Sequence, residues 1–458
     1  MPSADTIFNA SKKVFAHYFH PFPVSIDNAL SANDYYNTQY LAINGESNKW
    51  VKEGGYLRQR PLGVAIGTSA NWQQLNMEGE VRAAIARGIT GFTFDVLGAS
   101  DVTAGGPLSL MLAAAQAVDS RFKIVVMPDI TELGSDSSAV VSIIAAAASS
   151  PAAYRLSDGR LVVSAFDAGL NSAAWWQSVI SQLSAQGIQI AFVPTFLAWP
   201  AAPAAYAAFS YGFADWGTAT APAATALESE PKTVHTTYGK IYMMPVDPQQ
   251  YRPKDFLFWE AGNSASYRDA WTASIQGDAD WVQVVTWNDF SESSQIAPST
   301  DTSLRRYIGT GYYNLTGYYA SWFLTGQQPQ ITHDVLYWFY RREATTAAGP
   351  AQSQLDGIAT GTGTAQNDIE LLAFLTSPGV LTITIGGKTY TENAAAGVVS
   401  FSVPSQAGTP VFTLSRSGAE VFSMTGGITI YGAGGLPTGV QDLTYWNGSA
   451  SKAGVCSL

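Results

Sequence analysis

Up to about Arg342, short apolar runs alternate along the chain with alanine-rich segments of helical character. A near-continuous apolar run is typical of a strand covered on both faces, as in a parallel sheet. Strand and helix alternating over this length predict an α/β fold of the (β/α)8 barrel type. A doubly wound sheet is the alternative, but no G-x-G-x-x-G or G-x-x-x-x-G-K motif follows any of the runs. We expect strands at residues 14–19, 91–96, 123–130, 161–168, 188–196, 209–216, 240–247 and 281–289.

The sequence pattern changes after Arg342. Residues 344–363 are rich in Ala, Thr, Gly and Ser, which is typical of a linker. Beyond them, apolar and polar residues alternate between closely spaced turns, which predicts an all-β sandwich. We therefore expect a barrel at 1–343, a linker at 344–363 and a β-sandwich domain at 364–458. This last domain is either a packing module for the barrel or a glycan-binding module that uses Tyr431, Tyr445 or Trp446.

Charge and composition exclude several classes of partner. Net charge is -11 with only 24 Lys and Arg and no basic block, so nucleic acid is not expected. No apolar run approaches membrane-spanning length. Cys456 is the only cysteine and the four histidines lack ligand spacing, so neither a metal nor a cofactor is expected. The 13 Trp and 22 Tyr suit stacking on uncharged carbohydrate, and we expect a monomer whose partner is a polysaccharide substrate.

The N-terminal residues lack the apolar core of a signal peptide. Three N-x-S/T triplets, at Asn9, Asn314 and Asn447, nevertheless favour passage through the secretory pathway. We expect a secreted, extracellular protein whose leader is absent from this chain.

Polar residues stand where several of the predicted strands end. In a (β/α)8 barrel these ends converge on the face that carries the active site. One Asp after a strand is usually a helix N-cap, but several at equivalent positions indicate that some bind substrate. Aromatic residues just beyond strand ends add stacking surfaces. The substrate-binding candidates are His17, Asp95, Asp129, Asp167, Trp199, Trp216, Asp247, Tyr251, Trp287 and Asn288.

The last predicted strand leads into two carboxyl residues three positions apart, Asp289 and Glu292. Such a pair suits glycoside chemistry, in which one carboxyl protonates the leaving oxygen and the other activates water or attacks the sugar. The alternative is a strand-capping Asp beside a solvated Glu. Both side chains would reach one cleft if the barrel is right, which makes them the catalytic candidates.

The TWND-x-x-ES element at residues 286–293 resembles the signature of glycoside hydrolase family 71, the fungal α-1,3-glucanases or mutanases. KKVFAHYF (12–19), FLFWEAGNSASYRDAWTASI (256–275) and FSVPSQAGTPVFTLSRSG (401–418) are also similar to the family, so the resemblance spans nearly the whole chain. It implies a secreted barrel enzyme with an appended β domain that hydrolyses α-1,3-glucan with inversion, and endo action. It also implies that Asp289 and Glu292 are the catalytic pair, and we expect Glu292 to be the general acid and Asp289 the general base or the residue that positions water.

The chain departs from the family pattern at the mouth of the expected cleft. Thr90, Asp95 and the pair Asp167–Ala168 replace residues common in the family, and residues 246–250 replace a Ser-Pro-Trp-Phe run. These changes motivate one alternative, a related barrel glycosidase with a different linkage or sugar. A non-catalytic glycan-binding protein is another, but binding alone has no use for two partly desolvated carboxyls.

Overall fold

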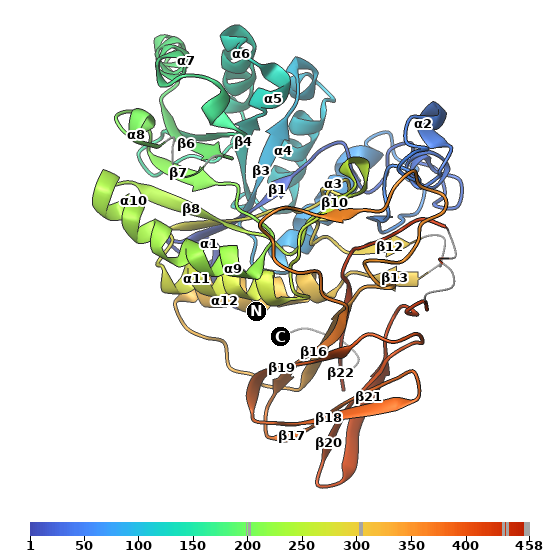
Figure 1. Ribbon diagram of the computed structural model, residues 1–458. Coiled ribbons are helices and arrows are strands. Elements are labelled where there is room, and N and C mark those ends of the chain that lie inside the picture. The colour runs from blue at the N-terminus through green and yellow to red at the C-terminus, as the bar shows by residue number, and fades with distance from the viewer. Residues whose placement is uncertain (198, 200–202, 302–305, 433–435, 437–438, 453–458) are drawn as a thin grey trace.

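The eight apolar runs form one closed barrel of parallel strands (Figure 1). The computed structural model describes residues 1–458 apart from 198, 200–202, 302–305, 433–435, 437–438 and 453–458. The barrel strands are β1 (Lys13–Tyr18), β3 (Gly91–Val96), β4 (Lys123–Pro128), β5 (Leu161–Ala165), β6 (Ile190–Phe196), β7 (Gly212–Asp215), β8 (Ile241–Val246) and β11 (Trp281–Val284). Because β1 pairs with both β3 and β11, the sheet closes on itself. The predicted (β/α)8 barrel is confirmed, and the doubly wound alternative is excluded.

Helices cover the outside of the barrel, and their sequences explain where they lie. In α6 (Ser137–Ala148) the buried residues include Ile143, Ile144 and Ala147, spaced as one helical face. The Asp136 side chain caps this helix by accepting a hydrogen bond from its first turn. The other long helices are α3 (Trp72–Ile85), α4 (Pro107–Val118), α7 (Ala173–Ala185), α10 (Glu230–Tyr238), α11 (Ala265–Gln276) and α12 (Gly311–Thr325).

Short strands and helices lie outside the eight barrel strands. Two three-stranded sheets join distant segments, in the orders β15-β10-β9 and β13-β12-β2. Their strands are β2 (Arg60–Pro61), β9 (Tyr251–Arg252), β10 (Leu257–Phe258), β12 (Ser299–Asp301), β13 (Arg306–Ile308) and β15 (Gly357–Ile358). The short helices are α1 (Ala4–Asn9), α2 (Gly45–Asn48), α5 (Ile130–Leu133), α8 (Pro203–Tyr206) and α9 (Ala221–Ala226).

Side-chain alternation along the strands fills the barrel interior. Phe15 of β1 packs with Met243 and Trp281 in an apolar cluster of strand residues. Since successive strand side chains point to opposite faces, His17, two residues further along β1, shares the inward side with Phe15. The same period brings Asp95 to the end of β3. The C-terminal ends of the strands therefore carry polar groups above an apolar base.

The C-terminal part of the chain forms two four-stranded antiparallel sheets, β19-β16-β14-β22 and β18-β17-β20-β21. An apolar cluster of residues from both sheets fills the space between them, as expected of the predicted β-sandwich. Tyr445 and Trp446 are each 1% exposed, so neither offers a surface for glycan. The strands are β14 (Val335–Tyr340), β16 (Asp368–Leu375), β17 (Gly379–Ile385), β18 (Lys388–Ala394), β19 (Gly397–Pro404), β20 (Val411–Arg416), β21 (Ala419–Thr425) and β22 (Trp446–Ser451).

The predicted domain boundary after residue 343 needs correction, because β14 already belongs to the β domain. Tyr337 and Phe339 of this strand pack in the barrel's outer core, whereas Leu336 and Trp338 pack inside the sandwich. A strand buried on both faces has the same sequence pattern as a barrel strand. The barrel therefore ends with α12, and the β domain (orange to red in Figure 1) lies against that helix.

The segment 344–363 is not a loose linker. The Ser353 amide donates to the carbonyl of Lys52 at 2.7 Å, and the Thr345 amide donates to the Asn367 side chain at 2.8 Å. Its strand β15 pairs with β10 of the barrel domain. Its small and polar residues form an ordered connection held by both domains.

The three N-x-S/T triplets differ in accessibility. Asn9 is exposed at the end of α1. The Asn314 side chain contacts Arg87 and Ser449. Asn447 is 5% exposed, and its side-chain oxygen accepts from the backbone at the start of α12. In the folded chain, Asn9 is the accessible acceptor of the three.

Within the described residues, no helix has the length and apolar character needed to cross a membrane.

Candidate active site

A cavity of about 530 Å³ lies at the C-terminal ends of the barrel strands. It brings together both catalytic candidates, Asp289 and Glu292, with four of the predicted substrate-binding residues: His17, Asp95, Asp129 and Trp216. Its wall also includes Phe19, Tyr56, Thr131, Glu132, Phe166, Leu197, Gln250, Arg252, Lys254, Trp259 and Ser291. Carboxyls, cations and aromatic rings thus face one cavity.

The turn after β11 fixes the position of Asp289. The Asp289 amide donates to the Thr286 hydroxyl at 2.7 Å. One carboxyl oxygen, Oδ1, accepts from the amide and hydroxyl of Ser291, both at 2.8 Å, and from the Glu292 amide at 3.2 Å. Three donors on one oxygen stabilise the ionised form of this carboxyl. They also immobilise it, as a residue that positions a water molecule requires.

Glu292 receives weaker support for its negative charge. Gln250 donates to Oε2 at 2.9 Å, and Arg252 Nε lies 3.5 Å from Oε1. Burial, followed by the charge of Asp289, raises the pKa of Glu292 to about 7, against the opposing effect of the cations Arg252 and Lys254. The side chain is still 16% exposed and can reach a ligand. Glu292 therefore keeps a proton at mildly acidic pH.

The two carboxyls differ in the way that acid–base catalysis needs. Burial also raises the pKa of Asp289, but the Ser291 hydrogen bonds and the charge of Lys254 oppose this. When two adjacent carboxyls share one negative charge, the better-solvated anion carries it. The proton thus belongs to Glu292 and the charge to Asp289, which pairs a proton donor with a proton acceptor.

His17 and Asp95 form an uncharged polar corner of the cavity. Burial lowers the pKa of His17 to about 3, so its ring is neutral. Burial, followed by the charges of Asp129 and Asp289, raises the pKa of Asp95 well above its usual range. Their closest atoms are 3.9 Å apart, too far for a hydrogen bond. His17 Nδ1 and Asp95 Oδ1 are buried without a protein partner, so both can bind a ligand hydroxyl.

Trp216 provides an aromatic surface beside this corner. Its ring meets His17 edge-on at 4.8 Å and Phe166 at 4.7 Å. These contacts fix the indole, while the residue stays partly exposed. A held, partly exposed indole suits the apolar face of a sugar ring.

Asp129 and Asp167, both predicted to bind substrate, differ in whether they reach the cavity. Asp129 lines the cavity, but its Oδ1 also caps α5 by accepting from Thr131 at 2.8 Å and 2.6 Å, the common role of an Asp after a strand. Asp167 is partly exposed with a left-handed backbone (φ 45°) and does not belong to the cavity wall. Its neighbour Phe166 lines the wall instead.

Trp287 and Asn288 lie outside the cavity, against our expectation. Trp287 is 1% exposed, and its indole donates to Glu80 at 3.2 Å while packing near Phe92. The Asn288 side chain accepts from the Phe19 amide and donates to two carbonyls of the loop after β1. Both residues follow the strand proper, where the regular alternation of side chains ends. They support the turn that carries Asp289.

Trp199, Asp247 and Tyr251 also lie outside the cavity wall. Trp199 packs against Phe196 and Tyr242. Asp247 is buried, which raises its pKa well above the usual range. The Tyr251 hydroxyl donates to Asp356 at 2.6 Å, away from the cavity. Strand-end position alone did not distinguish these side chains from those that enter the lumen.

Several residues of the cavity wall were not among those predicted from the sequence. Gln250, Arg252 and Lys254 come from the irregular stretch after β8, whose path depends on pairing between β9 and β10. The unusual residues at 246–250 were the available signal. Among the described residues, no group of three His, Cys, Asp or Glu side chains could hold a metal ion.

Fold and site together define a class of protein. A (β/α)8 barrel with two carboxyls of unequal proton affinity at its C-terminal face, next to a fixed indole, has the features of a glycoside hydrolase. A family model described as glycosyl hydrolase family 71 matches residues 64–457, and the chain belongs to this family. The resemblance seen in the sequence is confirmed.

Known proteins show related sequences. The glucan endo-1,3-alpha-glucosidase agn1 of Schizosaccharomyces pombe is 24% identical over 380 residues, 79% of this chain and 88% of that protein. A mutanase of Penicillium rubens is 26% identical over 251 residues, 52% of each chain. Among solved structures, a GH99 endo-alpha-mannosidase of Bacteroides thetaiotaomicron has a similar fold, with TM-score 0.50, 17% identity and coverage of 68% of this chain and 97% of that one.

Proposed function

We propose that the protein is an endo-acting hydrolase of α-1,3-glucan in which Glu292 is the general acid and Asp289 the general base. The observation that carries the proposal is the unequal pair: burial keeps a proton on Glu292, while three hydrogen bonds favour charge on Asp289. Family membership and the names of the relatives, a glucan endo-1,3-alpha-glucosidase and a mutanase, support the substrate.

The proposed reaction is a single displacement. Glu292 gives its proton to the glycosidic oxygen as the bond from that oxygen to the anomeric carbon breaks. Water attacks the anomeric carbon from the opposite face, and Asp289 takes the proton that the water loses. The α-linkage then yields a reducing end in the β configuration. NMR of the first product tests this, since an initial α anomer would contradict inversion.

Substrate binding in this proposal uses the uncharged corner and the indole. The free His17 Nδ1 and Asp95 Oδ1 match sugar hydroxyls, which both donate and accept hydrogen bonds. Trp216 stacks on the ring face. Neutral groups at this corner of the cavity suit an uncharged glucan.

Two nearly isosteric variants test the catalytic roles. We expect Glu292→Gln and Asp289→Asn each to lower reducing-sugar release from insoluble α-1,3-glucan by at least about a hundredfold. Circular dichroism and the thermal midpoint of unfolding show whether each variant is folded. A folded variant with near-normal release would disprove its assigned role. If the wild type released no sugar, a panel of other α-linked oligosaccharides would test the alternative linkage.

We also propose that the protein is secreted. The exposed Asn9 triplet supports this, and the S. pombe relatives include one named as an ascus wall endo-1,3-alpha-glucanase. Expression in a eukaryotic host followed by glycosidase treatment and mass spectrometry tests it. We expect glycan on Asn9; a secreted protein without it would remove this line of support.

A further inference from the structure

The segment between β8 and β10 connects the catalytic carboxyl to the β domain. Three consecutive residues contact Glu292: Gln250 donates to its Oε2 at 2.9 Å, the Tyr251 amide donates to its carbonyl at 2.7 Å, and Arg252 lies 3.5 Å from Oε1. These contacts fix both the backbone and the carboxyl group of Glu292. The position of the proposed acid therefore depends on how residues 249–252 are held.

The same segment is anchored on its other side by residues far along the chain. The Tyr251 hydroxyl donates to Asp356 at 2.6 Å and lies 3.0 Å from the carbonyl of Gln441. The Gln249 side chain accepts from the Tyr445 amide at 2.7 Å. All four side chains of Gln249, Tyr251, Asp356 and Gln441 are at most 4% exposed. Buried hydrogen bonds of this kind are costly to break, so they restrict the segment.

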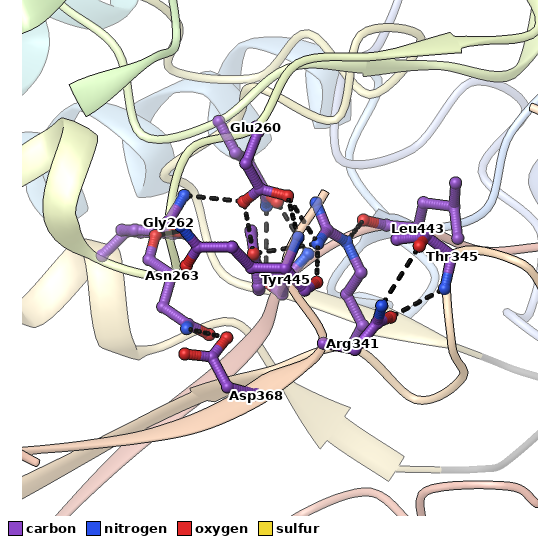
Figure 2. Close-up of polar contacts among 12 residues, drawn as sticks. Glu260, Gly262, Asn263, Arg341, Thr345, Asp368, Leu443 and Tyr445 are labelled. Atoms are coloured by element: carbon purple, nitrogen blue, oxygen red, sulfur yellow. Dashed lines mark hydrogen bonds and ion pairs between the residues drawn. The ribbon is translucent and has the colours of Figure 1, made fainter. Parts of the chain in front are cut away.

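Tyr445 itself contacts residues of both domains, as Figure 2 shows. Its hydroxyl donates to Glu260 at 2.5 Å, and the Arg341 guanidinium lies 3.9 Å from its ring centroid. Arg341 also donates to Glu260 at 3.1 Å and to the Leu443 carbonyl at 2.8 Å. Glu260 follows β10 in the barrel domain, whereas Arg341 follows β14 in the β domain. The anchor for Gln249 is therefore rigid and spans both domains.

We propose that the β domain acts as a positioning device for Glu292, transmitted by Tyr251 and Gln249 through residues 249–252. This inference rests on the proposed role of Glu292 as the catalytic acid. It gives the β domain a part in the reaction even though Tyr445 and Trp446 are buried from solvent. Tyr251 and Gln249 are positioning residues, since neither lines the cavity.

Tyr251→Phe is the sharpest test, because it removes one hydroxyl and keeps the buried ring. We expect kcat on a soluble α-1,3-linked oligosaccharide to fall by about tenfold while KM stays within about twofold, as expected when alignment and not binding is lost. Gln249→Leu should also lower kcat with little change in KM, because it breaks the hydrogen bond between Gln249 and the Tyr445 amide. The matched control is Tyr267→Phe, whose buried hydroxyl bonds Thr316 between α11 and α12 at 2.7 Å. It should retain wild-type kcat.

The pH profile separates positioning from simple destabilisation. The titratable groups coupled electrostatically to Glu292 are Asp289, Arg252, Lys254, Asp247 and Tyr56. Because the Gln250 bond and the Arg252 charge lower the pKa of Glu292, a displaced segment should move the alkaline limb of activity to higher pH. A general loss of stability lowers the thermal midpoint without moving that limb.

The possible outcomes distinguish failure of the positioning role from failure of the proposed function. If Tyr251→Phe and Gln249→Leu keep the wild-type kcat and pH profile, the inference is wrong even if both variants melt earlier. If Glu292→Gln is active, the proposed function fails first. If Glu292→Gln is inactive while Tyr251→Phe is fully active, only the positioning role is overturned. In the Glu292→Gln background, Tyr251→Phe should leave oligosaccharide affinity unchanged, and weaker binding would also contradict the inference.

Discussion

Replacement of Gln250 by leucine should change the pH range of activity in a direction fixed by the cavity. The Gln250 amide donates to Glu292 Oε2 at 2.9 Å, and this bond favours the ionised carboxyl. Gln250→Leu removes the donor and adds an apolar side chain. Both changes disfavour the charged form, so the pKa of Glu292 must rise.

The size of the rise follows from the strength of the bond. A hydrogen bond to a charged group contributes about 1.5–3 kcal/mol, and about 1.4 kcal/mol corresponds to one pKa unit. Because Glu292 is 16% exposed, water replaces part of the lost donor, and the lower end applies. The pKa of Glu292 should therefore rise from about 7 to about 8.

The assay is kcat/KM on a soluble α-1,3-linked oligosaccharide from about pH 4 to about pH 9, which reports groups of the free enzyme. The alkaline limb should move up by about one pH unit, while the acidic limb, set by Asp289, moves less. Gln328→Leu is the matched control, since Gln328 bonds Tyr318 outside the cavity. An alkaline limb that stays in place or moves to lower pH would refute the assignment of that limb to Glu292.

Three further changes address binding and stability. Trp216→Ala should raise KM by about fivefold to tenfold with a smaller change in kcat, through loss of about 1 kcal/mol of stacking; an unchanged KM would contradict the stacking role. Arg341→Met leaves the buried Glu260 without its cation, so the free energy of unfolding measured in denaturant should fall by about 3–5 kcal/mol. Arg416 pairs with Asp334 at 2.6 Å and 2.8 Å and lowers the pKa of that carboxyl to about 2, so the pair stabilises the fold above the usual Asp pKa, and the effect is lost as pH falls through about 2. Arg416→Met should cost about 1–2 kcal/mol at neutral pH, and the difference from wild type should shrink as pH falls toward 2 and vanish below it; a pH-independent difference would argue against the ion pair.

The barrel was predictable because burial on both faces gives its strands an unmistakable apolar pattern. The same reasoning placed His17, Asp95 and Asp129 at strand ends, and all three line the cavity. Regular alternation explains this success, since a residue two positions beyond an inward side chain also points inward.

The predictions that were wrong concern residues beyond the ends of the regular strands. Trp287 follows β11 by three residues and points to Glu80 on α3 instead of to the lumen. Gln250 and Arg252 enter the cavity only because β9 and β10 fold back on each other, a long-range pairing with no local signature. The strand 335–340 carries no sign of its partners, because burial on two faces looks the same in either domain.

The double-sided packing of β14 has a consequence for how this architecture can be altered. Val335, Tyr337 and Phe339 complete the outer layer of the barrel, and Leu336, Trp338 and Tyr340 complete the interior of the sandwich. A recombinant chimera joined at the loop after α12 would therefore inherit a strand matched to only one of its neighbours. Exchange of C-terminal modules between relatives must preserve both sets of side chains together, so the two halves of the molecule are constrained to evolve as a pair.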